Sequence, residues 1–404
     1  MSRTNEYTPI ILEVGARFIK AGIAGQSQPL STLVTSVEFP ETVHELEIPS
    51  FFGLEDSALT SSQYDLLSTN LWLDPNIHAL SRQYTQEAHK WINFHRDFES
   101  ILHGILLQMF SSELLVSPRR CKVILVDCNF SVVTKFKLAQ ILLGKLMVKS
   151  VILQPESILS TIASDTENAL VFDFGWQGFR IDLIIDLRNV SINTRTEFNT
   201  LTGTELHYKF VLKLFEVLEK DVVERLTQRN DFFELIEQFI MTAMYVNGRS
   251  DSNKSYDLSD VFELVDGITI PSRLRYEVIE ECFFDNEELV RIVDSVIRKS
   301  TVDSRPLLLQ NVVITGGVSN VPGFRCRLLE ELRHYYKDVK VDSKVCMGSW
   351  SGCSLYVSSV LVNQDKSVWK EKELTRDILN SLSNERGYKL SGFPDTINSL
   401  HRHQ

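Results

Sequence analysis

The sequence predicts an α/β protein made of two similar halves around a cleft. Short apolar runs bounded by glycine alternate with amphipathic segments, a pattern typical of buried strands with helices packed on them. In addition, an apolar strand followed by an acidic-x-glycine turn occurs twice, at Ile11–Gly15 and at Val171–Gly175, and a second apolar strand follows each turn. One such turn would be an ordinary hairpin, because glycine and aspartate are common turn residues. Two at matching places indicate a duplicated domain.

The individual elements follow from the period of the apolar residues. Buried strands are expected at Pro9–Val14, Lys122–Asp127, Ala169–Phe174, Ile181–Leu187 and Asn311–Thr315. Helices with one apolar face are expected at Asp97–Leu115, Glu205–Leu226, Glu287–Arg298 and Phe324–Tyr336. The first of these helices should end before Pro118, because proline cannot continue a helix.

Charge and composition exclude several classes of function. The 42 Lys and Arg residues against 53 Asp and Glu residues give a formal net charge of −11, which argues against nucleic acid as a ligand. The sequence has neither an apolar run long enough for membrane insertion nor a signal-peptide core, so a cytosolic or nuclear location is expected. The six cysteines lack the paired spacing of a zinc site and are interpreted as buried thiols.

Four motifs, in order along the chain, carry a resemblance to a known family. The first hairpin motif is Leu12–Gly15 followed by Phe18–Gly25, and a shorter version stands at Asp173–Gly175. The later motifs are Thr315–Gly317 running into Val321–Phe324, and Trp350–Gly352 with Trp369 beyond it. With these residues the sequence resembles actin and the actin-related proteins. The resemblance implies an actin-like fold, a duplicated α/β architecture of the ribonuclease H type with two halves around a nucleotide cleft.

The resemblance also divides the chain. It places the first half at residues 1–155 and 345–370, the second half at residues 156–344, and a polar tail at residues 371–404. Within the first half, residues 26–95 are rich in Ser, Thr, Asn, Gln and Pro and are interpreted as a divergent peripheral insertion. The tail is expected to be mobile apart from a short helix at Leu374–Leu382.

Within the family, softer features resemble the type that occupies the pointed end of the dynactin filament. They are Leu114–Arg120 leading into a strand, Ser150–Pro155 with a proline after the glutamine, the bulky residue between Asp173 and Gly175, and the closing loop Val318–Phe324.

The resemblance implies a nucleotide site in the cleft. The residues that match its nucleotide-binding positions are Glu13, Gly15, Lys20, Asp173, Gly175, Gly316 and Gly317. Lys20 would contact a phosphate, Glu13 and Asp173 would reach Mg²⁺ through its water shell, and Gln154 matches the glutamine that orients the attacking water. Two states stay open: ATP or ADP with Mg²⁺ held structurally, or an empty pocket.

Several residues depart from the family pattern. Glu13 replaces the usual aspartate, and Ala16 and Arg17 replace a small hydroxyl residue and a glycine in the first loop. Arg180 stands at the position of a histidine that assists hydrolysis, and Trp176 replaces a small acidic residue. Ile240 and Met241 stand where charged residues would hold an adenine. Activation of water should suffer, so turnover is expected to be slow or absent.

The resulting expectation is a structural protein that is not an enzyme. It would be a non-motor subunit of dynactin that caps the pointed end of the short actin-like filament and supports dynein-driven transport along microtubules, including nucleus migration. Its partners would be the actin-like filament subunit and the pointed-end subunits, with dynein indirectly, in the cytoplasm and cytoskeleton. The alternatives are a nuclear actin-related subunit of a chromatin-remodelling complex, and a small-molecule kinase using Asp182 or Asp186 as base.

Overall fold

The structure is a computed structural model of the 404-residue chain. It describes residues 7–34 except 16, residues 100–191 except 101, 131 and 177, residues 197–198, residues 200–249 except 230, residues 260–361, and residues 369–384 except 371. These residues form two compact units. Thr166–Cys346 belong to the second unit, and the described residues before Thr166 and from Met347 onward belong to the first. The first unit thus extends to Asp165, whereas the sequence placed the division after residue 155.

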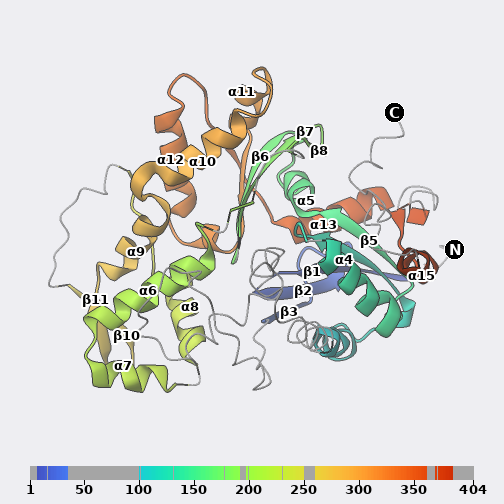
Figure 1. Cartoon of the computed structure of the whole chain (residues 1–404), viewed down its shortest axis with the longest axis horizontal. Coiled ribbons are helices and arrows are strands. Elements are labelled where there is room, and N and C mark those ends of the chain that lie inside the picture. The colour runs from blue at the N-terminus through green and yellow to red at the C-terminus, as the bar shows by residue number, and fades with distance from the viewer. Residues whose placement is uncertain are drawn as a thin grey trace. The chain divides into compact units, whose positions relative to one another are not determined.

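The first unit is built on a mixed sheet with strand order β3-β2-β1-β4-β5 (Figure 1). Its strands are β1 (Thr8–Val14), β2 (Phe18–Ile23), β3 (Ser31–Val34), β4 (Cys121–Asp127) and β5 (Ser150–Pro155). The central strand β1 pairs antiparallel with β2 and parallel with β4, and β4 pairs parallel with β5. The carboxyl ends of β1, β4 and β5 therefore lie at the same edge of the sheet.

Both faces of this sheet are buried, and successive side chains alternate between them. Ile10 and Leu12 belong to one apolar cluster, whereas Ile11 belongs to another. In β4, Val123 likewise joins the first cluster and Ile124 the second. Because side chains alternate along a strand, a strand with two buried faces is an unbroken apolar run. This explains why the strands were recognisable in the sequence.

Helices cover the two faces. The face with Ile10 is covered by the helical residues 102–108, the π-helical turns Met109–Glu113 and Gln140–Lys145, α4 (Val132–Ala139) and α15 (Arg376–Asn384). The opposite face is covered by α5 (Glu156–Ile162) and α13 (Ser349–Tyr356). The π-helical turn Val357–Leu361 follows α13 directly in the chain. The helix expected at Asp97–Leu115 packs on the sheet through Leu106 and ends at Glu113, before Pro118. Its first residues, 97–99, lie outside the described part.

The chain after Trp369 also belongs to the first unit. Leu374 exchanges two backbone hydrogen bonds with Val151 of β5, at 2.9 and 2.7 Å. Leu374 and Leu379 are buried in the apolar cluster, and the Arg376 guanidinium donates to the carbonyl of Leu143 at 2.8 and 3.0 Å. The helix expected at Leu374–Leu382 is present as α15, shifted by two residues. Apolar burial and the backbone bridge fix residues 372–384 to the sheet edge.

The second unit repeats the topology of the first. Its sheet has the order β13-β12-β6-β7-β8, and β9 also pairs with β7. The strands are β6 (Ala169–Phe174), β7 (Phe179–Ile185), β8 (Arg188–Asn189), β9 (Glu197–Phe198), β12 (Val312–Thr315) and β13 (Ser343–Lys344). The central strand β6 pairs antiparallel with the next strand of the chain and parallel with β12, as β1 does with β2 and β4. The predicted duplicated α/β fold, with β1 and β6 as central strands, is confirmed.

Strand β7 ends two residues earlier than the sequence suggested. Asp186 and Leu187 have φ values of 50° and 56° and connect Ile185 to Arg188, its partner in β8. Positive φ at both central residues defines the two-residue turn that suits a hairpin. A leucine rarely adopts this conformation, so the sequence did not indicate the turn.

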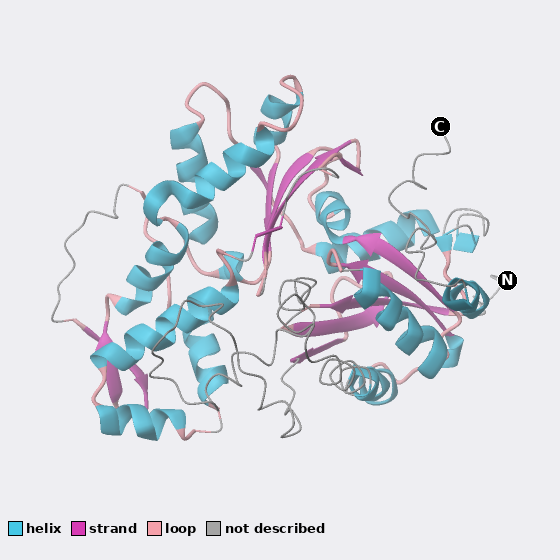
Figure 2. Cartoon of the chain, viewed as in Figure 1, coloured by secondary structure: helices cyan, strands magenta, loops and turns pink. Residues whose placement is uncertain are grey.

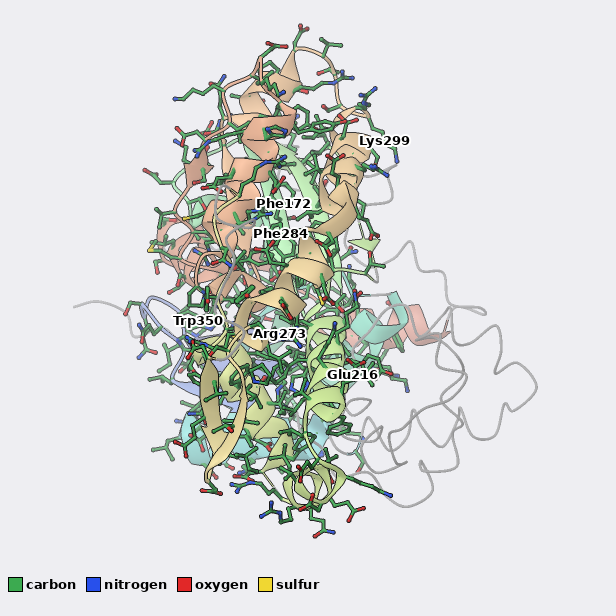
Figure 3. The ribbon with its side chains drawn as sticks, turned by 90° about the vertical axis from the view of Figure 1, so that its left-hand side faces the viewer. Phe172, Glu216, Arg273, Phe284, Lys299 and Trp350 are labelled. Carbon is green, nitrogen blue, oxygen red and sulfur yellow. The ribbon has the colours of Figure 1, made fainter. Side chains whose placement is uncertain are left out.

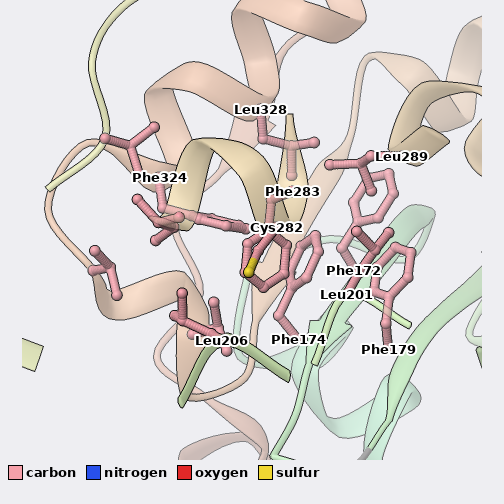
Figure 4. Close-up of a cluster of buried hydrophobic side chains, with 14 of the residues drawn as sticks. Phe172, Phe174, Phe179, Leu201, Leu206, Cys282, Phe283, Leu289, Phe324 and Leu328 are labelled. Atoms are coloured by element: carbon pink, nitrogen blue, oxygen red, sulfur yellow. The ribbon is translucent and has the colours of Figure 1, made fainter. Parts of the chain in front are cut away.

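Aromatic residues fill the core of the second unit. The ring of Phe174 stacks on Phe179 with centroids 4.5 Å apart and meets Phe324 edge-on at 4.9 Å (Figure 4). In Figure 3, Phe172 lies inside the unit, whereas Glu216 projects from its surface. Paired aromatic rings of this kind combine a large buried area with a defined geometry, so they fix β6 and β7 against α12.

The helices of the second unit pack around this core, and Figure 2 shows them among the strands and loops. They are α6 (Gly203–Val217), α7 (Lys220–Thr227), α8 (Phe232–Thr242), α9 (Leu274–Phe283), α10 (Glu288–Ile297), α11 (Ser304–Leu309) and α12 (Phe324–Tyr335), with the hairpin β10 (Val261–Val265) and β11 (Ile268–Pro271) beside them. None of the helices in the described ranges has the length and apolar character needed to cross a membrane.

The prediction of a single helix at Glu205–Leu226 is wrong, because the chain turns between α6 and α7. Leu218 is extended, with φ −93° and ψ 148°, and packs against the core. The turn brings Leu226 of α7 back onto the same core, where it is fully buried. Tertiary packing thus overrides a helical period that is otherwise continuous.

Candidate functional site

The first candidate element is the hairpin between β1 and β2. The Gly15 N–H donates to the carbonyl of Phe18 at 2.9 Å and closes the turn. A Cβ atom at Gly15 would lie 2.9 Å from the same oxygen, so the turn requires glycine. Arg17 within this loop is buried, and its guanidinium carbon lies 5.7 Å from the centre of the Phe18 ring. Residue 16 lies outside the described part.

Glu13 and Lys20 face each other across this hairpin and form an ion pair. Their Cα positions are partners in the β1–β2 register, and Lys20 Nζ lies 2.5 Å from Glu13 Oε1. The other carboxylate oxygen, Oε2, accepts a hydrogen bond from Ser349 Oγ at 2.9 Å. Burial alone would lower the pKa of Lys20, but the charge and hydrogen bond of Glu13 outweigh burial and raise that pKa above its ordinary value. Both oxygens of Glu13 are therefore engaged within the first unit.

Two more polar residues stand at the carboxyl edge of the first sheet. Gln154 of β5 is 2% exposed, and its Nε2 has no hydrogen-bond partner among the described residues. Asp127 ends β4, accepts from the Phe130 N–H at 3.0 Å and pairs with Lys135 at 2.6 Å. A buried amide without a partner costs stability unless water or a ligand satisfies it. Gln154 therefore indicates that a polar group is held at this edge.

The second candidate element is the hairpin between β6 and β7, which reproduces the first. The Gly175 N–H donates to the carbonyl of Gly178 at 2.9 Å, and a Cβ atom at Gly175 would again lie 2.9 Å from that oxygen. Asp173 and Arg180 are partners in the register, at the positions that Glu13 and Lys20 hold in the first unit.

Arg180 binds two carboxylates on this hairpin. Its NH2 nitrogen lies 3.4 Å from Asp173 Oδ2, and its Nε lies 3.1 Å from Asp182 Oδ2. Asp182 also accepts from the Asn189 side chain at 3.1 Å. The buried side chains of Arg180 and Asp182 thus belong to a network of charged and polar side chains that connects β6, β7 and β8. The kinase interpretation is weakened, because Asp182 is paired within the sheet and Asp186 lies in the turn.

The two glycines at the end of β12 differ sharply. Gly316 has φ +89°, and a Cβ atom there would lie 2.3–2.5 Å from backbone atoms of Phe174. Gly317 has an ordinary helical conformation, with φ −59° and ψ −44°, and a Cβ atom would meet nothing within 4 Å. Gly316 is therefore required by the packing of β12 on β6, whereas no described neighbour requires Gly317.

The second hairpin is tied to the start of α6. Trp176 O accepts hydrogen bonds from the N–H and the hydroxyl of Thr204, at 2.8 and 2.7 Å. Gly203 donates to the carbonyl of Gly175 at 3.0 Å. Thr202 caps the helix by accepting from the Glu205 N–H at 3.1 Å. The backbone of Trp176 therefore ties the second hairpin to the first turn of α6.

These residues fit a bound phosphate better than a hydrated divalent ion. Within the first unit, the backbone turn at Gly15 and the Gln154 amide are groups that could hold a phosphate. Lys20 would have to exchange its pair with Glu13 for one with that phosphate. The carboxylates assigned to the metal are already engaged inside each unit: Glu13 is paired with Lys20 and accepts a hydrogen bond from the Ser349 hydroxyl, and Asp173 is paired with Arg180. Glu13, with both oxygens engaged, does not fit a role as an acceptor for the water shell of Mg²⁺, and pairing with Arg180 makes Asp173 a weaker acceptor for it.

The candidate residues gather into two local groups. Glu13, Gly15 and Lys20 lie together in the first unit, and Asp173, Gly175, Gly316 and Gly317 lie together in the second. Ile240, expected beside an adenine, is instead buried in the core of the second unit. Asp127 and the pairing of Asp182 were not predicted from the sequence. An acidic residue at the carboxyl end of a buried parallel strand was the available signal for Asp127.

The chain has recognisable relatives. A family model described as Actin matches residues 4–370. Actin-related protein 2 of Acanthamoeba castellanii is 23% identical over 373 residues, which covers 85% of this chain and 86% of that protein. Actin-related protein 2 of Oryza sativa subsp. indica is 23% identical over 353 residues, covering 82% of each chain. Actin-like protein 8 of Homo sapiens is 24% identical over 339 residues, covering 80% of this chain and 85% of that protein. With the family model spanning most of its length, the chain belongs to the actin family.

Proposed function

We propose that this chain is a structural subunit that ends an actin-like filament, and that it does not work by hydrolysing nucleotide. The observation that supports this proposal is the internal neutralisation of the carboxylates on both hairpins. Glu13 is paired with Lys20, and Asp173 is paired with Arg180. Carboxylates engaged in this way are poor candidates for organising the metal that phosphoryl transfer needs.

A nucleotide in this chain would have a structural role. Gln154 keeps an unsatisfied amide at the sheet edge, which suits contact with a phosphate or an ordered water. A ligand that binds only the folded state stabilises it by RT ln(1 + [L]/Kd). ATP or ADP would thus stabilise the fold without turnover. Steady phosphate release from pure wild-type protein, absent in Gln154→Ala, would contradict this part of the proposal.

The assembly we favour is dynactin, with this chain at the pointed end of its actin-like filament. Filament subunits make heterologous contacts, which continue without limit unless one subunit lacks a joining face. The segment 26–95 does not resemble the region through which actins bind their pointed-side neighbour, and most of it, residues 35–95, lies outside the described part. A subunit with one joining face intact and one replaced would act as a cap, and the replaced face would recruit the pointed-end subunits.

The intact joining face is assigned to the segment around α13. Trp350 and Trp369 are themselves buried, so they shape this region and do not contact a partner. Met347 and Leu355 are 61% and 47% exposed, although both are apolar. We assign the filament contact to these two side chains. Contiguous exposed apolar surface marks protein interfaces, and these two side chains lie in the segment that the resemblance assigns to the filament contact.

Affinity purification of the tagged full chain tests the assembly. We expect dynactin filament and pointed-end subunits to co-purify, with dynein as an indirect partner, and the tagged protein to localise to the cytoplasm. Leu355→Asp should release the filament, whereas Leu107→Asp, at a residue 46% exposed in the helix that covers the opposite face of the first sheet, should not. Purified protein should not polymerise alone in ATP and Mg²⁺. Long filaments of the pure chain would refute the capping role, and nuclear localisation with remodelling subunits would replace dynactin by the alternative assembly.

A further inference from the structure

The duplicated fold allows the two hairpins to be compared position by position. The first places one acid opposite one base, Glu13 opposite Lys20. The second places Asp173 opposite Arg180, adds a second acid, Asp182, two residues further along β7, and has Glu197 of β9 as the register partner of Arg180 on its other side. The guanidinium of Arg180 therefore serves two carboxylates, at 3.4 and 3.1 Å.

This charged group is buried on one face of the sheet. The side chains of Arg180 and Asp182 are each 8% exposed, and that of Asp173 is 16% exposed. Neighbouring side chains on β6 and β7 alternate between this face and the aromatic core, to which Phe172 and Ile181 belong. The side-chain network continues from Asp182 through Asn189 to Ser191, whose hydroxyl donates to Asn189 Oδ1 at 2.6 Å.

Asp173 and Asp182 are diagonal neighbours on adjacent strands, and burying two like charges on one face of a sheet is costly without a cation. Unpaired buried carboxylates would repel each other and take up protons instead of staying ionised. Proteins often meet this need with a bound divalent ion, which is commonly the largest charge in its site. Here a guanidinium meets it, and arginine suits the task because it stays charged and its planar fork reaches two carboxylates at once.

We propose that Arg180 is a built-in cation that takes the place of a divalent metal ion at the second hairpin, so that the buried carboxylates of Asp173 and Asp182 are paired and the second unit is stable without metal. The chemical class of the displaced ligand is a hard divalent cation bound by carboxylate oxygens, such as Mg²⁺. The inference concerns the second unit alone and does not rest on the proposed filament assembly.

Thermal unfolding of the full chain with EDTA or with millimolar Mg²⁺ tests this inference. The midpoint temperature of wild-type unfolding should be the same in EDTA as in Mg²⁺. Arg180→Gln in EDTA should lower the midpoint by roughly 6–20 °C, because removing one partner of a buried ion pair strands the other charges. Mg²⁺ should then recover part of that loss. The double variant Asp173→Asn, Arg180→Gln should lose the response to Mg²⁺, because one of the two carboxylates is gone.

Arg229 offers a matched control on the surface. Its guanidinium also pairs with two aspartates, Asp231 at 2.8 Å and Asp266 at 2.5 Å, but these carboxylates are 59% and 71% exposed. Arg229→Gln should shift the midpoint by less than about 3 °C and give no response to Mg²⁺, because exposed ion pairs contribute little.

The outcomes separate a cation substitute from an ordinary ion pair. A wild-type midpoint that rises with Mg²⁺ would overturn the inference, and so would an Arg180→Gln midpoint that falls without any recovery in Mg²⁺. An unchanged Arg180→Gln midpoint in EDTA would show that the carboxylates need no cation, which also overturns it. If this variant does not fold during expression, the yield of folded protein on refolding with Mg²⁺ or EDTA gives the same comparison.

Discussion

Gly316→Ala should destabilise the protein strongly, whereas the same change at the adjacent Gly317 should not. A Cβ atom at Gly316 would lie 2.3–2.5 Å from the backbone of Phe174, and its φ of +89° disfavours any side chain. The left-handed conformation costs about 1–2 kcal/mol, and overpacking typically costs about 1–3 kcal/mol more. We therefore expect a loss of about 2–5 kcal/mol in the free energy of unfolding, or a midpoint lowered by roughly 4–20 °C.

Gly317→Ala is the matched control because it differs by one position. Its φ is −59°, and a Cβ atom would meet nothing within 4 Å. Alanine there should be neutral or stabilise by about 0.4–1 kcal/mol, since it restricts the unfolded chain. Thermal unfolding of both purified variants, followed by circular dichroism, measures the difference. Equal midpoints for the two variants would show that the contact with Phe174 does not hold β12 in place.

Three further experiments test separate parts of the structure. Leu106→Ala should cost about 2–5 kcal/mol of unfolding free energy as a core truncation, whereas Leu107→Ala, at an adjacent residue 46% exposed, should cost under about 0.5 kcal/mol; a peripheral helix would give two small values in chemical denaturation. The raised pKa of Lys20 means that its ion pair stabilises the folded state below pH 10.5 and that this contribution is lost as pH rises further. Lys20→Met should therefore unfold at a lower temperature than wild type at neutral pH, with the gap closing in strongly alkaline buffer; a constant gap would contradict the pairing. Iodoacetamide should modify the exposed Cys326 first in native protein, checked by mass spectrometry of peptides, because burial raises the pKa of the three buried thiols and blocks access to them; rapid labelling of a buried thiol would contradict the packing.

The strands of the fold were predictable because their chemistry is local. β1 and β4 have two buried faces, so they appear in the sequence as unbroken apolar runs. The acidic-x-glycine turns were equally visible, since Gly15 and Gly175 are required by the closure of each hairpin. Such signals depend on neighbouring residues alone, which is why two sheets with matching topology could be inferred from one sequence.

The remaining features depend on contacts between distant segments. Leu218 interrupts a continuous helical period because it packs against the core, and Leu374 pairs with Val151 although its surroundings in sequence are polar. The partners of Arg180 follow from the β6–β7 register, which places Asp173 opposite it. The sequence identified Arg180 as a departure from the family but gave no indication of its two carboxylate partners.

The glycine motifs of this chain therefore indicate its fold more strongly than they indicate a bound nucleotide. Gly15 and Gly175 avoid contact with a carbonyl of their own turn, and Gly316 avoids contact with the backbone of Phe174. All three would be required by these hairpins and strands whether or not a nucleotide were bound. Gly317 is different, because no described neighbour excludes a side chain there. If a phosphate or ribose approaches the second unit closely, Gly317→Ala should weaken ATP binding without lowering thermal stability. Unchanged ATP affinity in that variant would show that no bound nucleotide lies against Gly317. The fold would then be the explanation for the other three glycines, Gly15, Gly175 and Gly316.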